Sequence, residues 1–115
     1  MSTYKIENHF EGKDPVVWQI YNELMTRLSL LGPVTAAPKK TSIHLDNKSG
    51  FAGVYTRKSY ILLHFRLAHQ VEDPRISKIE KHSAHRFMHT VTLRSGADID
   101  NQLVQWLKEA YELAG

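Results

Sequence analysis

Apolar and polar residues alternate over Thr41–Asp46, and a strongly apolar run follows at Tyr60–Leu67. A period of two is typical of a strand with one buried face. Phe51–Arg57, between these two runs, is rich in aromatic and β-branched residues. Turn-forming residues at Asn47–Gly50 and Arg57–Ser59 separate the runs, so this part of the chain predicts three consecutive strands joined by tight turns.

The alternation also assigns side chains to the two faces of the predicted sheet. The core face is expected to hold Ile43, Leu45, Ile61, Leu63 and Phe65. The opposite face is expected to hold Ser42, His44, Leu62, His64 and Arg66. A slip of one residue would exchange the two sets.

A helical period appears before and after the strands. Asp14 and Pro15 predict the start of a helix that ends near Leu31, before Gly32-Pro33. Its apolar face comprises Val17, Ile20, Tyr21, Leu24, Leu28 and Leu31. A final helix capped by Asp98 is expected to reach about Ala114, with an apolar face of Ile99, Leu103, Trp106, Leu107 and Ala110.

Three segments remain between these elements. Residues 34–40 are expected to connect the first helix to the strands. Asp73-Pro74, followed by Ile76 and Ile79 three residues apart, predicts a short helix over Pro74–Lys81. Phe87–Arg94 predicts a fourth strand.

The predicted fold class is α+β. We expect one domain over residues 1–115, with 1–13 as a lead-in segment that Tyr4, Ile6 and Phe10 attach to the body. A four-stranded, mainly antiparallel sheet would carry the N- and C-terminal amphipathic helices on one face.

Composition narrows the classes of function. The 115 residues include no cysteine, which excludes disulfides, thiolate metal sites and cysteine nucleophiles. No apolar run is long enough for a transmembrane helix, and the N-terminus lacks the apolar region of a signal peptide. We therefore expect a cytoplasmic protein with no membrane partner, and its net charge of +3 is compatible with anionic partners.

Short motifs along nearly the whole chain resemble a known family. They are Asn8–Gly12, Leu31–Pro33, Lys40–Ile43, Phe51–Val54, Asp73–Arg75, His89–Leu93, Asp98–Asp100 and Trp106–Tyr111. In this order they resemble the short bacterial domain numbered 5655 among domains of unknown function, whose members are often labelled predicted transport proteins. The resemblance implies no established activity. Its association with nuclease-like domains in related proteins favours a nucleic-acid partner by analogy.

Basic residues give the main indication of a partner. We expect contacts with nucleic acid or another anion from Arg57, Lys58, Arg66, Arg75 and Arg86, with Tyr55, Tyr60 and Phe87 available for stacking on bases. The alternative is that these cations are only a solvated surface. Alanine at Arg57 and Lys58 is expected to weaken polyanion binding, whereas changes at His44 or His64 are not.

Histidines suggest a different class of site. His44, Tyr55, His64 and His89 would line a pocket if they share the exposed sheet face, where imidazoles could transfer protons near neutral pH. A polar, solvated sheet face is the alternative. His82, His85 and His89 have helical metal-ligand spacing. Because His89 falls in the predicted strand Phe87–Arg94, and Glu80 is the one acidic residue nearby, we expect no metal and no cofactor.

No known catalytic motif occurs in the chain. The sequence therefore predicts a non-catalytic binding or accessory module for an anion, with a histidine pocket protein or enzyme as the alternative. A homodimer is a further possibility if Ala52, Val54 and Leu62 lie on an uncovered sheet face that the first 13 residues leave free.

Overall fold

A computed structural model describes residues 4–115 of the chain. Its elements in order are η1 (Ile6–Phe10), α1 (Pro15–Ser29), β1 (Thr35–Pro38), β2 (Ile43–Asp46), β3 (Gly50–Thr56), β4 (Ile61–Leu67), β5 (Ile76–Ser83), β6 (Arg86–Leu93), η2 (Gly96–Asp98) and α2 (Asn101–Leu113). The α+β class is confirmed.

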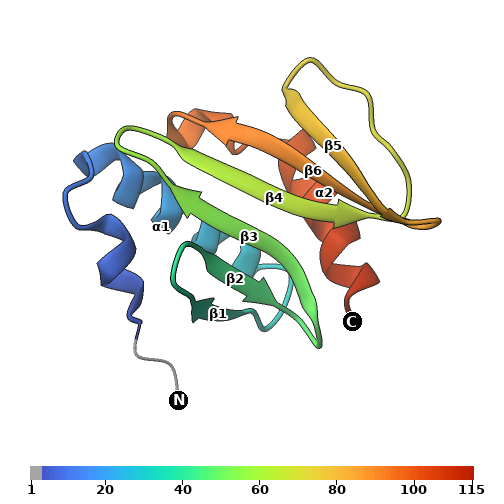
Figure 1. Ribbon diagram of the computed structural model, residues 1–115, viewed down its shortest axis with the longest axis horizontal. Coiled ribbons are helices and arrows are strands. Elements are labelled where there is room, and N and C mark those ends of the chain that lie inside the picture. The colour runs from blue at the N-terminus through green and yellow to red at the C-terminus, as the bar shows by residue number, and fades with distance from the viewer. Residues whose placement is uncertain (1–3) are drawn as a thin grey trace.

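The strands form one sheet in the order β1-β2-β3-β4-β6-β5, and each neighbouring pair is antiparallel (Figure 1). The sheet has six strands, so the prediction of four was wrong. β6 pairs directly with β4, which places β5 on the outer edge and β1 on the other edge.

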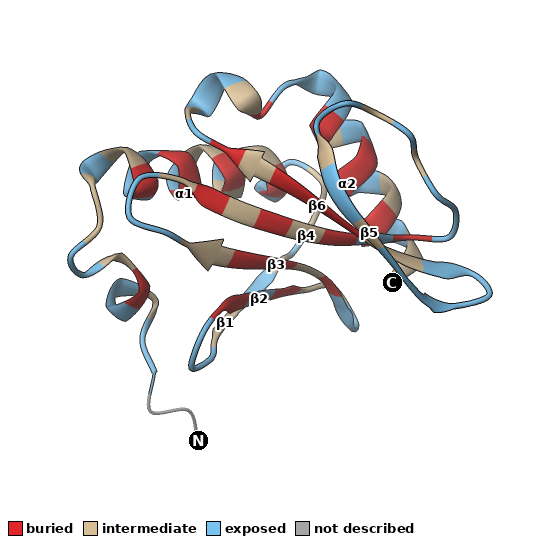
Figure 2. Cartoon of the chain, turned by 45° about the horizontal axis from the view of Figure 1, so that its top comes forward, coloured by how far each residue is buried: buried red, intermediate tan, exposed pale blue. Residues whose placement is uncertain are grey.

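Both helices cover the same face of the sheet, as predicted (Figure 1). Along β4 every second residue is buried and the residues between them are partly buried or exposed (Figure 2), because successive side chains of a strand point to opposite faces. All five predicted core-face residues of the strands are fully buried, and so are nearly all residues of the two predicted helix faces, with Leu31 partly buried. Ser42, which was assigned to the opposite face, is also buried.

The two extra strands replace the predicted connector and the predicted short helix. β1 is part of 34–40 and pairs with β2 over Thr35–Pro38. The segment Pro74–Lys81 is largely strand β5, and the helix prediction there was wrong because of a bulge. Ile76 pairs with Val91 and Ile79 with His89, so the extra residue between them places two isoleucines three apart on the same face.

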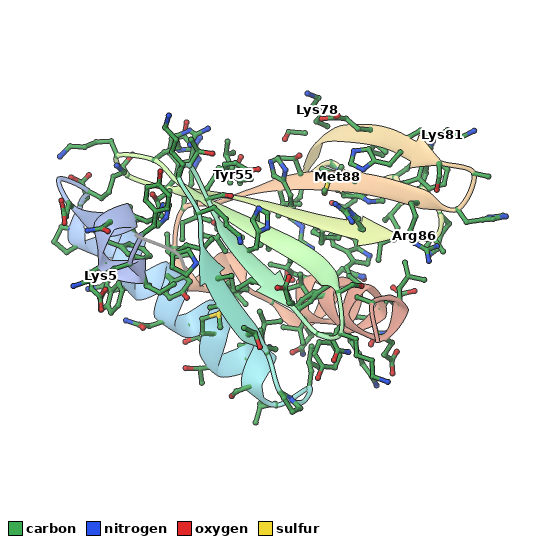
Figure 3. The ribbon with its side chains drawn as sticks, turned by 60° about the horizontal axis from the view of Figure 1, so that its bottom comes forward. Lys5, Tyr55, Lys78, Lys81, Arg86 and Met88 are labelled. Carbon is green, nitrogen blue, oxygen red and sulfur yellow. The ribbon has the colours of Figure 1, made fainter. Side chains whose placement is uncertain are left out.

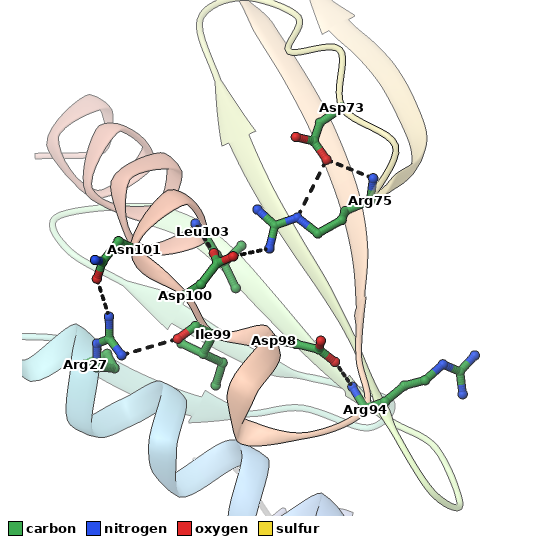
Figure 4. Close-up of polar contacts among 9 residues, drawn as sticks. All are labelled: Arg27, Asp73, Arg75, Arg94, Asp98, Ile99, Asp100, Asn101 and Leu103. Carbon is green, nitrogen blue, oxygen red and sulfur yellow. Dashed lines mark hydrogen bonds and ion pairs between the residues drawn. The ribbon is translucent and has the colours of Figure 1, made fainter.

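The helix boundaries were predicted to within a few residues, but the caps differ. Asp14 makes no capping hydrogen bond and instead pairs with Lys58, with Oδ1 and Nζ 3.3 Å apart. Asp100, not Asp98, caps α2, because its side chain accepts a hydrogen bond from the Leu103 amide at 2.9 Å. Asp98, the last residue of η2, accepts hydrogen bonds from the Ser95 amide and, as Figure 4 shows, from the Arg94 amide.

Within residues 4–115, no helix is both long and apolar enough to cross a membrane.

Candidate binding face

The sheet face away from the helices, here called the open face, carries its side chains in rows across the strands. The central row is continuous in register from β1 to β5: Ala37, His44, Gly53, His64, Thr90 and Lys78. Tyr55, Leu62 and Thr92 form a row on one side, and Arg66, Met88 and Glu80 form a row on the other. Figure 3 shows Tyr55 and Met88 on the side of the sheet away from the two helices.

A hollow of about 260 Å³ lies at the centre of this face, lined in part by His44, Gly53, Tyr55, His64 and Arg66. Gly53 stands between the two histidines, which are two strands and therefore roughly 10 Å apart. Gly53 has no side chain, yet it is buried. A Cβ there would be 3.6 Å from Cε1 of Tyr55, so the tyrosine ring leans over this position.

Tyr55 and His64 form an aromatic pair at one wall of the hollow, with ring centroids 4.6 Å apart and planes 34° apart. Burial lowers the pKa of His64 below its ordinary value; Glu80 opposes the shift, and Lys78 and Arg57 add to it. His64 is therefore a mainly neutral imidazole at pH 7. Glu80 is itself held by Lys78, with Oε1 and Nζ 3.0 Å apart, and this contact lowers the pKa of Glu80.

Arg66 stands at the rim of the hollow, near the end of β4. It also lines a second, smaller hollow of about 80 Å³ together with Arg86 and the last turn of α2. Arg66 makes no ion pair with any carboxylate in the described part of the chain. The last turn of α2 therefore lies at the same corner of the sheet as both arginines.

The five basic residues nominated from the sequence do not form one surface. Arg57 lies in the turn between β3 and β4, at the opposite end of β4 from Arg66 and roughly 20 Å along the strand from it. The Nζ of Lys58 forms an ion pair with Asp14 and donates a hydrogen bond to the Gly12 carbonyl oxygen at 3.0 Å. Only Arg66 and Arg86 share a corner.

Arg75 belongs to the helix-covered side of the molecule (Figure 4). Its guanidinium Nη1 contacts Asp100 Oδ2 at 3.0 Å, its Nε lies 3.6 Å from Asp73, and its Cζ lies 5.2 Å from the centre of the Trp106 ring. These contacts fasten the segment before β5 to the start of α2. Arg75 therefore has partners within the chain, and we withdraw it from the proposed anion-binding set.

His89 is also withdrawn, from the pocket set. β6 does lie beside β4, but His89 pairs with Phe65 and faces the helices, where it is fully buried. Its Nε2 accepts a hydrogen bond from the Val71 amide at 3.1 Å, so Nδ1 carries the proton and donates it to the Phe87 carbonyl at 3.0 Å. Both ring nitrogens are used in folding the chain.

The metal-ligand candidates and the proposed dimer residues are not brought together by the fold either. No group of three or more potential ligands from His, Asp or Glu in residues 4–115 is arranged to hold a metal. Ala52 and Val54 face the helices, Val54 being fully buried, which corrects their assignment to an uncovered face. Leu62 alone of the proposed dimer residues lies on the open face.

The sequence did not single out Gly53 and Met88, which also line the hollow. The signal for Gly53 was its position opposite two histidines on the neighbouring strands, and recognising that position requires the strand register.

The family is established by comparison of the chain with protein-family models. Residues 6–114 match the model described as Domain of unknown function (DUF5655). The chain belongs to this family. No match was found among curated proteins, and none among solved structures.

Proposed function

We propose that the chain is a non-catalytic binding module that takes up an anionic, ring-bearing ligand on the open face, with single-stranded nucleic acid as the leading partner. The observation that carries this proposal is the hollow over Gly53, with the Tyr55–His64 pair at its wall and the Arg66 guanidinium at its rim.

Each part of the hollow suits a different part of a nucleotide. Aromatic faces stack on bases irrespective of sequence, and exposed cations contact phosphates. Arg66 and Arg86 supply charge at one end, and Arg57 lies at the other end of the same strand. A chain of several nucleotides laid along β4 would meet both ends.

The test is fluorescence polarisation with labelled single- and double-stranded oligonucleotides of mixed sequence at about 50 and 200 mM salt. Non-specific binding of this kind has a Kd of about 10⁻⁴ to 10⁻⁶ M at physiological salt. Replacing both Arg66 and Arg86 by alanine is expected to weaken binding. The log–log salt slope should also fall in magnitude by about 1.4, because each phosphate of a single strand that a cation neutralises contributes about 0.7.

Two variants examine the hollow itself. Gly53→Val fills its floor with a side chain that suits a strand, and Tyr55→Leu removes a stacking surface. The tyrosine change should weaken single-strand binding about fivefold or more, because stacking contributes about 1–3 kcal/mol per base. Lys108→Ala, on the exposed side of α2, is the matched charge control and should have little effect. No binding at low salt, or equal weakening by the lysine control, would reject the proposal.

A second candidate function rests on His64. A mainly neutral imidazole in a hollow of about 260 Å³ can accept a proton from a small acidic ligand or substrate. A thermal-shift screen with small carboxylates and phosphate esters tests this function. The second function would be favoured over the first if the parent protein does not bind oligonucleotides and if His64→Gln and Gly53→Val each abolish the thermal shift.

A further inference from the structure

A separate aromatic corner lies at the junction of η1 and α1, away from the open face. Glu7, Phe10, Glu11 and Trp18 line a hollow of about 270 Å³ there. Trp18 is 42% exposed, whereas the other tryptophan, Trp106, is 5% exposed. Such exposure leaves much of a large aromatic surface in water.

The rings of this corner are held at a fixed angle. Phe10 and Trp18 meet edge to face, with centroids 4.8 Å apart and planes 84° apart, so the two ring planes are nearly perpendicular. The buried Tyr21 packs against both, at centroid distances of 5.1 Å to Phe10 and 5.9 Å to Trp18. The walls are therefore fixed before any ligand arrives.

The charge of the corner is negative. Glu7 and Glu11 are exposed, and neither lies within ion-pairing distance of a basic group in residues 4–115. Asn8 donates a hydrogen bond to Oε1 of Glu11 at 3.0 Å, which restrains that carboxylate. Aromatic faces carry partial negative charge as well, so both the walls and the rim attract a cation.

We propose that this corner binds the trimethylammonium head group of a small quaternary-ammonium compound. A bare ammonium is strongly hydrated and would lose its water at apolar walls. A methylated head has an apolar surface that fits the two rings, and it keeps a positive charge for the carboxylates. Recognition of quaternary ammonium by aromatic walls is a known use of this interaction. The proposal does not depend on the open face.

The experiment follows the two indole N–H signals by ¹H–¹⁵N NMR during titration with choline. Trp18 should shift and the buried Trp106 should not. The matched ligand control is the uncharged analogue in which a tert-butyl group replaces trimethylammonium. Choline is expected to bind about two- to fivefold more tightly, the advantage typical of an exposed cation–aromatic contact.

Variants separate the rings from the charges. The double change Glu7→Gln and Glu11→Gln should bring the affinity for choline closer to that for the uncharged analogue and leave binding of the analogue unaffected. Glu112→Gln, an exposed acid at the end of α2, is the matched control and should change neither. Trp18→Leu should abolish choline binding. If that variant does not fold, the glutamine pair still decides the question, because both carboxylates are exposed.

Equal affinity for choline and its uncharged analogue would mean an apolar surface only and would overturn the proposal. So would a Trp18 signal that stays unmoved at saturating choline, or a glutamine pair that binds choline as well as the parent protein.

Discussion

The imidazole of His89 lies flat against the ring of Phe65, with centroids 5.4 Å apart and planes 6° apart. Both residues face the helices from neighbouring strands, and both are fully buried. A protonated imidazole could not accept the hydrogen bond of the Val71 amide, so the native fold requires the neutral form.

Stability is therefore expected to fall with acid. Burial lowers the pKa of His89 below its ordinary value of 6.5, and the Phe87 carbonyl opposes this shift. Below pH 6.5 the unfolded chain takes up a proton that the folded chain does not. The free energy of unfolding should then decrease as the pH falls, by up to about 1.4 kcal/mol per pH unit for one such residue, until the folded pKa is reached. Urea unfolding at pH 7.5, 6.5 and 5.5 measures this.

His89→Phe tests the origin of that pH dependence. The variant keeps the stacking but leaves the Val71 amide without its acceptor, at a cost of about 1–3 kcal/mol at neutral pH. Its stability should nevertheless vary less between pH 7.5 and 5.5 than that of the parent protein. His85→Gln, in the exposed hairpin between β5 and β6, should retain the full dependence. A parallel pH profile for the phenylalanine variant would contradict the assignment.

Gly32 ends the first helical segment in a conformation that a side chain would strain. Its φ is +145°, and a Cβ would come within 2.5 Å of the Tyr111 hydroxyl oxygen, which donates a hydrogen bond to the Pro33 carbonyl at 2.9 Å. Gly32→Ala should cost about 1–3 kcal/mol from the backbone alone.

Tyr111→Phe removes the closest clashing atom and should cost about 1 kcal/mol by itself, because its hydrogen bond to Pro33 is removed. The double variant should be more stable than the sum of the two single effects predicts, by about 0.5 kcal/mol or more. Denaturant unfolding of the four proteins gives this coupling. Strict additivity would mean that the hydroxyl and the glycine do not interact.

Asp100 joins a helix cap and an ion pair in one side chain. The Leu103 amide lowers the pKa of Asp100 most, and the Arg75 guanidinium lowers it further. Asp100→Ala should cost about 0.5–2 kcal/mol because the cap is removed. Asp100→Asn keeps the oxygen that accepts from Leu103, and should lose at most about 1 kcal/mol from the exposed ion pair.

Salt distinguishes the two contributions of Asp100. Thermal unfolding in about 0.1 and 1 M NaCl should show that the loss of stability in Asp100→Asn becomes smaller at high salt, because salt screens the pair with Arg75. Most of the loss of stability in Asp100→Ala should remain. Equal deficits for the two variants would show that the cap contributes nothing to α2.

The sequence was informative wherever one periodicity ran without interruption. β4 alternates over its whole length, so Ile61, Leu63 and Phe65 were placed correctly, and α1 and α2 showed clear helical faces. The prediction from the sequence was wrong at β5, because the bulge near Ser77 gives this strand a spacing of apolar residues that is typical of a helix. β1 is only four residues long and ends in Pro38, so no pattern distinguished it from a connector.

The site was less predictable because it depends on register between strands far apart in sequence. His44 and His64 were placed on the open face from their own strands. His89 was assigned to the open face as well, which was wrong, because it lies two and four residues before the buried Val91 and Leu93 and shares their helix-facing side. The contacts of Arg75 with Asp100 and Trp106 join segments about 25 residues or more apart and have no local signature.

The two edge strands described above bear on how the protein behaves at high concentration. β1 ends in Pro38, which has no amide hydrogen to offer a neighbouring strand. β5 carries Lys78, Glu80 and Lys81 on the opposite border of the sheet. Charged and proline-bearing edges discourage one sheet from continuing into the next. We therefore expect a chain that resists fibre formation while its broad sheet face remains free for a ligand.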